Sequence, residues 1–157
     1  MAIITAKNLG TSAFGGTPYG NLSRRHFVLE TNASGALVGG NSTAAIGATD
    51  KVILGVLPAG LRLDDSLLII SDAFTATITG DIGFEYVDGV DDSAVPQDPD
   101  YFFASVAITA ARTRQTTAVK PVTLPKDAYL TWTNEVAAHA SVGRADIFID
   151  GEDRGPQ

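Results

Sequence analysis

The stretch from residue 75 to residue 93, TATITGDIGFEYVDGVDDS, decides the fold, because a regular alternation of side chains leads into a run of carboxylates. One set of alternating positions is mainly apolar and the other mainly polar: Ala76, Ile78, Gly80, Ile82, Phe84 and Tyr86 against Thr77, Thr79, Asp81, Gly83 and Glu85. A period of two is typical of a β-strand with one buried face. The two internal glycines predict a bulge, a bend or a close approach by a neighbouring backbone.

Seven further stretches have the composition of short strands and lie between clusters of turn-forming residues. They are RRHFVLET (24–31), VILGVL (52–57), LLII (67–70), YFFASVAITAAR (101–112), TTAVKPVTL (116–124), AYLTWTNE (128–135) and RADIFID (144–150). The four consecutive apolar residues of 67–70 predict a strand buried on both faces, and Pro121 predicts an edge or a strand break. About eight strands without a clear amphipathic helix predict an all-β fold, an antiparallel β-sandwich with jelly-roll-like connectivity.

The composition predicts one folded domain preceded by an arm. Hydrophobic residues make up 45% of the 157-residue chain and charged residues 18%, a balance that favours a packed core over disorder. Residues 1–23 are rich in Gly, Thr, Ser and Asn and have no sustained apolar period, so we expect an extended N-terminal arm there. Residues 24–157 form the predicted single β-sandwich domain. The chain has no cysteine, so its stability depends on packing, association or both.

The charge balance argues against binding to nucleic acid. The net charge is −7, whereas a surface for phosphate backbones is expected to be basic. Residues 1–49 carry three basic side chains and a single acidic one, so nearly all of the acidic side chains lie after Thr49.

The sequence has no pattern typical of a membrane or secreted protein. No apolar run approaches the ~18 residues of a membrane span, and the first residues lack the basic and apolar regions of a signal peptide. We therefore expect no membrane partner and no export.

The acidic stretch DGVDDSAVPQDPD (88–100) has two interpretations. Calcium takes 6–8 oxygen ligands and would accept Asp88, Asp91 and Asp92, but the spacing differs from that of an EF-hand loop. The favoured interpretation is a solvated rim that keeps the ends of the sheets soluble and apart. Catalysis by paired carboxylates would need an apolar pocket that raises one pKa, which a Gly/Pro/Ser-containing loop does not predict.

The remaining candidates are isolated side chains. His26 and His139 lack the spacing of metal ligands, and AFGGTPYG lacks the lysine and the strand-to-helix setting of a phosphate loop. Trp132 with Tyr129 could form a platform for a sugar ring, although a lone tryptophan in an alternating strand is usually part of the core. We therefore predict no catalytic residue, no metal ligand and no cofactor.

Several motifs between residues 50 and 150 resemble the head decoration (cement) proteins of tailed bacteriophages, which are small β-sandwich proteins of the virion. They are the turn at Leu57–Gly60, the apolar strand Leu67–Ile70, the Thr/Ala-rich stretch Ala73–Thr79, the pair Gly83–Phe84 and the acidic loop Asp88–Asp92. The stretches AVKPVTLPKDAYLTW and VGRADIFID resemble the closing strands of the same kind of module. The Gly/Thr-rich arm is not part of the pattern.

The resemblance implies a non-enzymatic structural protein on the exterior of the capsid, assembled in the host cytoplasm. Its expected partners are the major capsid protein and further copies of itself, in a homotrimer that clamps adjacent capsid subunits. We expect the arm and the start of the first strand to make the contacts, with Phe14 and Tyr19 as apolar anchors and Arg24, Arg25 and His26 beside them. The alternatives are a carbohydrate- or calcium-binding sandwich and a tail or head-closure subunit of the virion.

Overall fold

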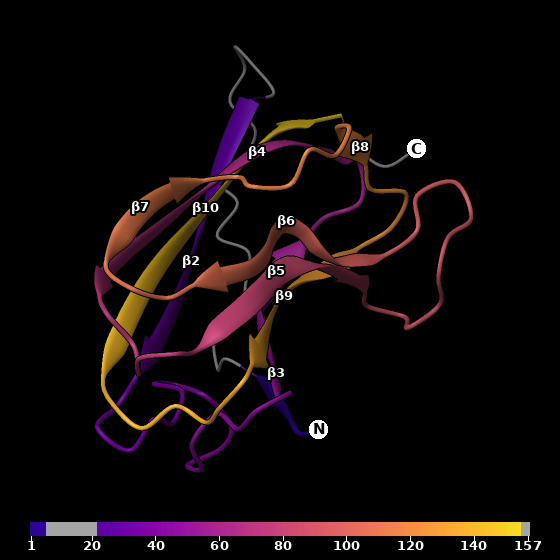
Figure 1. Ribbon diagram of the computed structural model, residues 1–157. Helices are drawn as coiled ribbons and strands as arrows, with labels where there is room; N and C mark the ends of the chain where they lie inside the picture. The colour runs from indigo at the N-terminus through magenta and orange to yellow at the C-terminus, as the bar shows by residue number, and fades with distance from the viewer. Residues whose placement is uncertain (6–21, 155–157) are drawn as a thin grey trace.

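The computed structural model describes residues 1–5 and 22–154, which form two β-sheets packed face to face (Figure 1). The strands are β1 (Ile3–Thr5), β2 (Leu22–Thr31), β3 (Lys51–Leu57), β4 (Leu61–Asp72), β5 (Thr79–Tyr86), β6 (Asp98–Ala107), β7 (Ala111–Arg114), β8 (Val122–Thr123), β9 (Ala128–Glu135) and β10 (Gly143–Asp153). The prediction of an all-β sandwich is confirmed. The described residues contain no helix of the length and apolar character that crossing a membrane requires.

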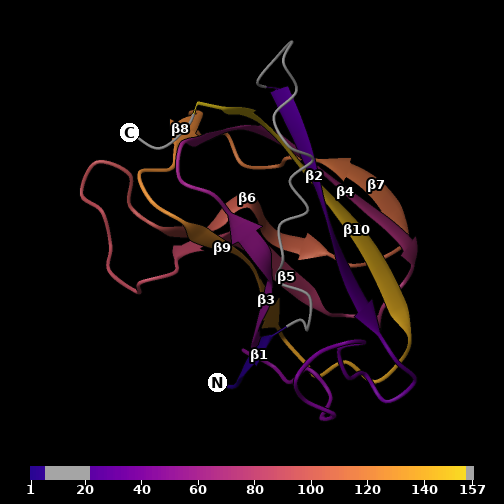
Figure 2. The same cartoon turned by 180° about the vertical axis from the view of Figure 1, so that it is seen from behind.

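Sheet neighbours come from distant parts of the chain. The first sheet has the order β1-β3-β9-β5-β6, and the second has the order β2-β10-β4-β7 with β8 beside β4. Every pair is antiparallel except β1 with β3. Figure 2 shows the second sheet from behind, with β10 lying between β2 and β4. This order is compatible with the jelly-roll-like connectivity that the sequence predicts.

The core fills the space between the two sheets. Inward-facing side chains alternate with outward-facing ones along β10, where Ala145, Ile147 and Ile149 are buried and their neighbours are half-buried. The first sheet contributes aromatic rings to the same core, including those of Phe84 and Trp132. Burial of this continuous apolar surface is what holds the two sheets together.

The alternation of the opening stretch is confirmed over β5. Its even-numbered residues from Gly80 to Tyr86 are buried, while Thr79, Asp81 and Glu85 are half-buried. The strand begins at Thr79 rather than at Thr75, since Thr77 has a positive φ of 75° that breaks the extended backbone. Both glycines lie at irregularities: a Cβ at Gly83 would meet the Asp98 carbonyl at 2.1 Å, and the pairing with β6 shifts register on both sides of Ile82.

Three strand predictions were wrong in detail. Residues 101–112 are not one strand, because the chain leaves the first sheet after β6 and crosses to form β7 in the second. The 67–70 run is not buried on both faces: Leu68 and Ile70 face the core, whereas Leu67 and Ile69 are half-buried on the outer face. Of the stretch 116–124 only β8 is a strand, and it begins directly after Pro121, which confirms the predicted break.

The first residues of the chain join the first sheet. β1, which the sequence did not predict, pairs in parallel with β3, and Ile4 is 3% exposed within the core. Residues 6–21 lie outside the described residues, so the extended arm and the boundary at residue 23 stay predictions. The next strand starts at Leu22, two residues before the expected position.

Candidate interface on the outer face of the second sheet

The outward side chains of β2, β10, β4 and β7 form one continuous surface, which we call the charged face. Its members are Arg24, His26, Val28 and Glu30 of β2, Arg144, Asp146, Phe148 and Asp150 of β10, Asp65, Leu67 and Ile69 of β4, and Arg112 and Arg114 of β7. They meet because cross-strand partners in register project from the same side of a sheet.

Ion pairs within the chain connect the strands across this face. Arg24 binds Asp150 in a bidentate pair, with Nε–Oδ1 at 2.6 Å and a second guanidinium nitrogen at 2.7 Å from Oδ2. Arg114 of β7 pairs with Asp65 of β4. The hydrogen bond and then the charge of Asp150 raise the pKa of Arg24, so the guanidinium keeps its positive charge.

A second cluster lies around Asp146. Arg144 approaches its carboxylate at 3.0 Å and reaches Glu30 at 3.1 Å. His26 Nε2 lies 2.7 Å from Asp146 Oδ1. The hydrogen bonds from Arg144 and then His26 hold the pKa of Asp146 below its usual value.

Apolar side chains occupy the middle of the charged face. The Phe148 ring stacks on His26 with centroids 4.6 Å apart, and the Arg24 guanidinium carbon lies 5.5 Å from the Phe148 centroid. Leu67 is the register partner of Phe148 on the other side, and Val28 and Ile69 flank Asp146 in the same way. All four apolar side chains are half-buried. An apolar centre bordered by charges has the composition of a protein–protein contact surface.

The structure separates the predicted contact residues. Arg24 and His26 lie on the charged face, where Arg24 is paired with Asp150 of its own chain. Arg25 projects from the opposite side of β2, with its side chain 12% exposed and 3.8 Å from Asp153. Phe14 and Tyr19 lie outside the described residues. Contact of these five residues with a partner stays a prediction.

Sequence reasoning missed the half of the face that β10 supplies. Phe148 and Asp150 were recognised as members of an alternating strand but not as neighbours of Arg24, from which Asp150 is 126 residues distant in the chain. The available signal was charge: Arg144, Asp146 and Asp150 occupy one side of the RADIFID alternation and match the opposite charges of β2.

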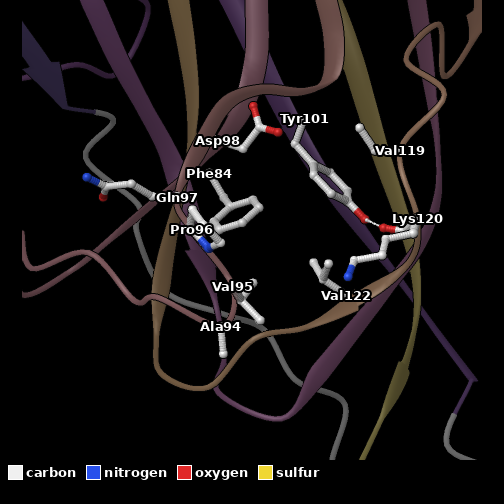
Figure 3. Close-up of a pocket in the computed structure, with 10 residues that line it drawn as sticks. All are labelled: Phe84, Ala94, Val95, Pro96, Gln97, Asp98, Tyr101, Val119, Lys120 and Val122. Atoms are coloured by element: carbon white, nitrogen blue, oxygen red, sulfur yellow. Dashed lines mark hydrogen bonds between the residues drawn. The ribbon is translucent and has the colours of Figure 1, made fainter.

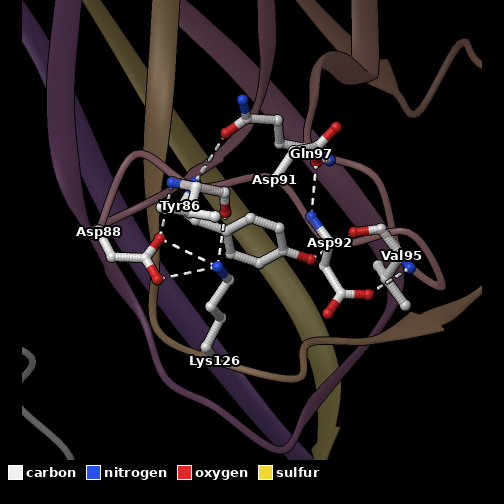
Figure 4. Close-up of polar contacts among 8 residues, drawn as sticks. Tyr86, Asp88, Asp91, Asp92, Val95, Gln97 and Lys126 are labelled. Carbon is white, nitrogen blue, oxygen red and sulfur yellow. Dashed lines mark hydrogen bonds and ion pairs between the residues drawn. The ribbon is translucent and has the colours of Figure 1, made fainter.

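The acidic loop, residues 87–97, uses its carboxylates to fold itself (Figure 4). Asp92 Oδ1 accepts hydrogen bonds from the backbone N–H groups of Val95 and Ala94, which lower the pKa of its carboxyl group. Asp91 Oδ1 accepts one from the N–H of Gln97 at 2.7 Å. Such carboxylate-to-backbone bonds are typical of turns.

Lys126 connects this loop to the first sheet through hydrogen bonds and a contact with an aromatic ring. Its ammonium donates to both oxygens of Asp88, at 3.0 and 2.8 Å, and to the Val90 carbonyl, and it lies 4.6 Å from the centre of the Tyr86 ring. Tyr86 in turn donates its hydroxyl proton to the Val95 carbonyl. Among the described residues, no group of three or more His, Asp or Glu side chains is placed to hold a metal ion.

Two candidates for ligand chemistry lie in the core. Trp132 is 1% exposed, with its ring over Gly80, so it has no free face for a sugar. His139 is also 1% exposed: its Nε2 lies 3.1 Å from Asn134 Oδ1, and its ring meets Phe74 edge-on. Burial lowers the pKa of His139 to about 4. Both side chains therefore have packing roles.

The comparisons with known proteins show the fold. No protein-family model and no curated protein matches the chain. A chain in the solved capsid of Ralstonia phage GP4 superimposes with a TM-score of 0.64 and 17% identity, covering 99% of this chain and 100% of its own. A chain in the asymmetric unit of the cyanophage Pam1 capsid gives a TM-score of 0.58 and 17% identity, over 91% of this chain and 93% of its own. This protein therefore shares their fold over most of its length.

Proposed function

We propose that this protein is a non-enzymatic structural protein of a bacteriophage virion, which decorates the outside of the capsid as a homotrimer and bridges major capsid subunits. The observation that carries the proposal is the match over 99% of the chain to a chain of a phage capsid. A match of that extent covers both sheets and the connections between them, so the whole molecule, and not an isolated motif, has the shape of a chain found in a virion.

The charged face supports this proposal as the surface that contacts the capsid. Its ion pairs are already formed within the chain, so the side chains that surround Phe148 are held in place before a partner arrives. Preorganised side chains lose less conformational entropy on binding. A half-buried aromatic ring at the centre of such a surface is the type of residue that contributes most to affinity.

The N-terminal segment completes the proposed contact. Phe14 and Tyr19 are proposed as apolar anchors, and Arg25 lies close to where that segment enters β2. Several separate contacts on one particle would give firm attachment even where each contact is weak.

The proposed homotrimer can be tested in solution. Light scattering should give three times the mass of one chain, and the mass of a monomer would contradict the trimer.

The proposal is tested by retention on capsids of the phage that encodes the protein, prepared without it. We expect the unaltered protein to co-sediment with the capsids and Phe148→Ala to be retained about tenfold less, since loss of a central aromatic contact costs more than ~1 kcal/mol. Ile53→Ala, at a half-buried outward position of β3 in the first sheet, is the matched control and should be retained normally.

Each outcome bears on a different part of the proposal. Failure of the unaltered protein to co-sediment would exclude decoration of the capsid, and co-sedimentation with tails instead would assign it to the tail or head-closure alternative. Equal retention of Phe148→Ala and Ile53→Ala would exclude the charged face, and full retention of Phe14→Ala with Tyr19→Ala would exclude the anchors. Thermal unfolding of every variant is measured first, so that loss of fold is not mistaken for loss of contact.

A further inference from the structure

A pocket of about 340 Å³ lies between the end of the acidic loop and the segment that leads into β8 (Figure 3). Its lining comes from β5, β6 and β8 and from the loops that precede β6 and β8, and it includes no residue of the charged face. The lining residues are Phe84, Ala94, Val95, Pro96, Gln97, Asp98, Tyr101, Val119, Lys120 and Val122.

Two aromatic rings belong to the apolar part of this pocket. Phe84 and Tyr101 are 1% and 5% exposed, and their rings meet edge to face with centroids 5.4 Å apart. The Tyr101 hydroxyl donates to the Lys120 carbonyl at 2.8 Å, so its polar end is satisfied within the wall. Val119, at the mouth, is 38% exposed. Transfer of an apolar side chain from water into a pocket lined by these groups is favourable.

Both walls are fixed by hydrogen bonds before anything binds. On one side, Asp92 and Tyr86 hold the backbone at Val95 through its N–H and its carbonyl. On the other side, the Thr117 hydroxyl donates to the Tyr101 carbonyl, and the Thr116 N–H donates to the Phe102 carbonyl at 3.2 Å. A preformed pocket binds its ligand without the cost of ordering loops.

The surroundings of the pocket are acidic. Asp98 lies in the lining, and burial, followed by a hydrogen bond between its side chain and that of Asp100, raises the pKa of Asp98 to about 6. Asp91 and Asp92 belong to the loop that forms the adjacent wall, and Lys120 is the basic residue of the lining. A positively charged group bound beside Asp98 would favour the ionised form of its carboxyl group.

We propose that this pocket binds a basic segment of another polypeptide, with one large apolar side chain against Phe84 and Tyr101 and lysine or arginine side chains facing Asp98 and Asp100. The pocket has room for one aromatic side chain. The carboxyl groups of Asp98 and Asp100 favour positively charged residues on either side of that aromatic residue in the bound segment. The inference goes beyond the proposed function and does not depend on it, since it concerns a different surface and a contact that can form in solution.

The experiment follows backbone amide shifts of the ¹⁵N-labelled full chain during titration with three synthetic peptides. The first has a central phenylalanine flanked by lysines, the second has glutamates in place of the lysines, and the third has alanine in place of the phenylalanine. We expect saturable shifts of Val95, Gln97 and Lys120 with the first peptide, and at least about tenfold weaker binding of the other two.

Two variants localise the effect. Asp98→Lys reverses the charge in the lining and should weaken binding of the first peptide about tenfold or more, whereas Asp72→Lys, an exposed position at the end of β4, should leave it within about twofold. The proposal is overturned if the first peptide gives no saturable shift, if the three peptides bind alike, or if Asp98→Lys binds like Asp72→Lys. None of these results affects retention on capsids, so the two proposals fail separately.

Discussion

At the scale of single residues, the contact between Gly80 and Trp132 shows how a glycine fixes the packing of the core. A Cβ at Gly80 would lie 2.1 Å from Trp132 Cζ2 and 2.4 Å from Cη2, both atoms of the six-membered part of the indole ring. Trp132 is 1% exposed, so its ring has no free space to move into. The predicted close approach by a neighbouring backbone occurs at Gly83 of the same strand, whereas the neighbour of Gly80 is a side chain.

We therefore predict that Gly80→Ala lowers the free energy of unfolding by about 2–3 kcal/mol through overpacking. Trp132→Phe removes the clashing atoms and leaves a cavity, which alone also destabilises the core. The double variant should be more stable than the sum of the two single effects predicts, by about 1 kcal/mol or more. Strict additivity in urea unfolding would contradict the proposed clash.

His139 is a residue whose protonation state is set by its surroundings. Asn134 donates both of its side-chain N–H groups, to the carbonyls of Gly47 and Ala137, so its Oδ1 is the acceptor for His139 Nε2–H. The other ring nitrogen, Nδ1, is buried without a hydrogen-bond partner among the described residues. The neutral ring thus joins the loop before β10 to β9, and the Asn134 side chain extends this connection to the loop before β3.

This arrangement predicts acid sensitivity. The folded-state pKa of about 4 lies below the ordinary value of 6.5, so the unfolded chain takes up the proton first as the pH falls between those values. The contribution of His139 to the free energy of unfolding is therefore present at pH 7 and is lost as the pH falls toward 4. From pH 7 to pH 5 the chain should lose about 2 kcal/mol relative to His139→Gln, which keeps a donor for Asn134 but does not titrate.

The comparison with His139→Gln is needed because protonation of Asp98 changes the free energy of unfolding in the opposite direction. Its folded-state pKa of about 6 lies above the ordinary carboxyl value of 3.8, so the folded chain takes up this proton first and acid favours folding at this site. Parallel pH profiles of the wild type and His139→Gln in denaturant unfolding would show that His139 does not titrate as described.

At the scale of elements, the strands with two-residue alternation were the predictable ones. β10 alternates in sequence and in burial, and β5 and β9 do so except at the buried Gly83 and Thr131. The stretch 101–112 is apolar at nearly every position, so its sequence has no signal at the point where the chain passes between sheets. The three residues of β1 are too short a run to be recognised, since they are specified by the β3 edge that they pair with and not by their own pattern.

The acidic loop is an element whose order depends on one lysine. Lys126→Met removes the hydrogen bonds to Asp88 and Val90 while keeping the length of the side chain. We expect the Val90 and Val95 amides to exchange with solvent about tenfold faster, with a change in global stability of only ~0–1 kcal/mol because the pair is partly exposed.

Lys120→Met is the matched control for this experiment, because it removes a lysine from the neighbouring segment whose side chain makes none of these bonds. Its amide exchange in the acidic loop should equal that of the unaltered protein. If amide exchange is accelerated equally in both variants, the cause is the loss of a positive charge and not the loss of the Lys126 hydrogen bonds to Asp88 and Val90.

At the scale of the whole molecule, composition and alternation were sufficient for the fold class but not for the candidate interface. Arg24 and His26 were recognised as polar residues of the first long strand, yet their neighbours Phe148 and Asp150 follow from a strand pairing that spans nearly the entire chain. A single sequence specifies the side that a residue faces and leaves open which strand will lie next to it. The pocket likewise depends on two loops that meet only in the folded protein.

The pairing of β2 with β10 also determines when the protein can fold during its synthesis. β2 is synthesised long before β10, its neighbour in the second sheet, and β4 also pairs with β10. Closing contacts this far apart along the chain is slow, and the apolar side of β2 remains uncovered until then. A nascent chain that stalls before Gly143 therefore exposes two strands without the one that joins them, which makes incomplete translation products the form of this protein most prone to aggregation.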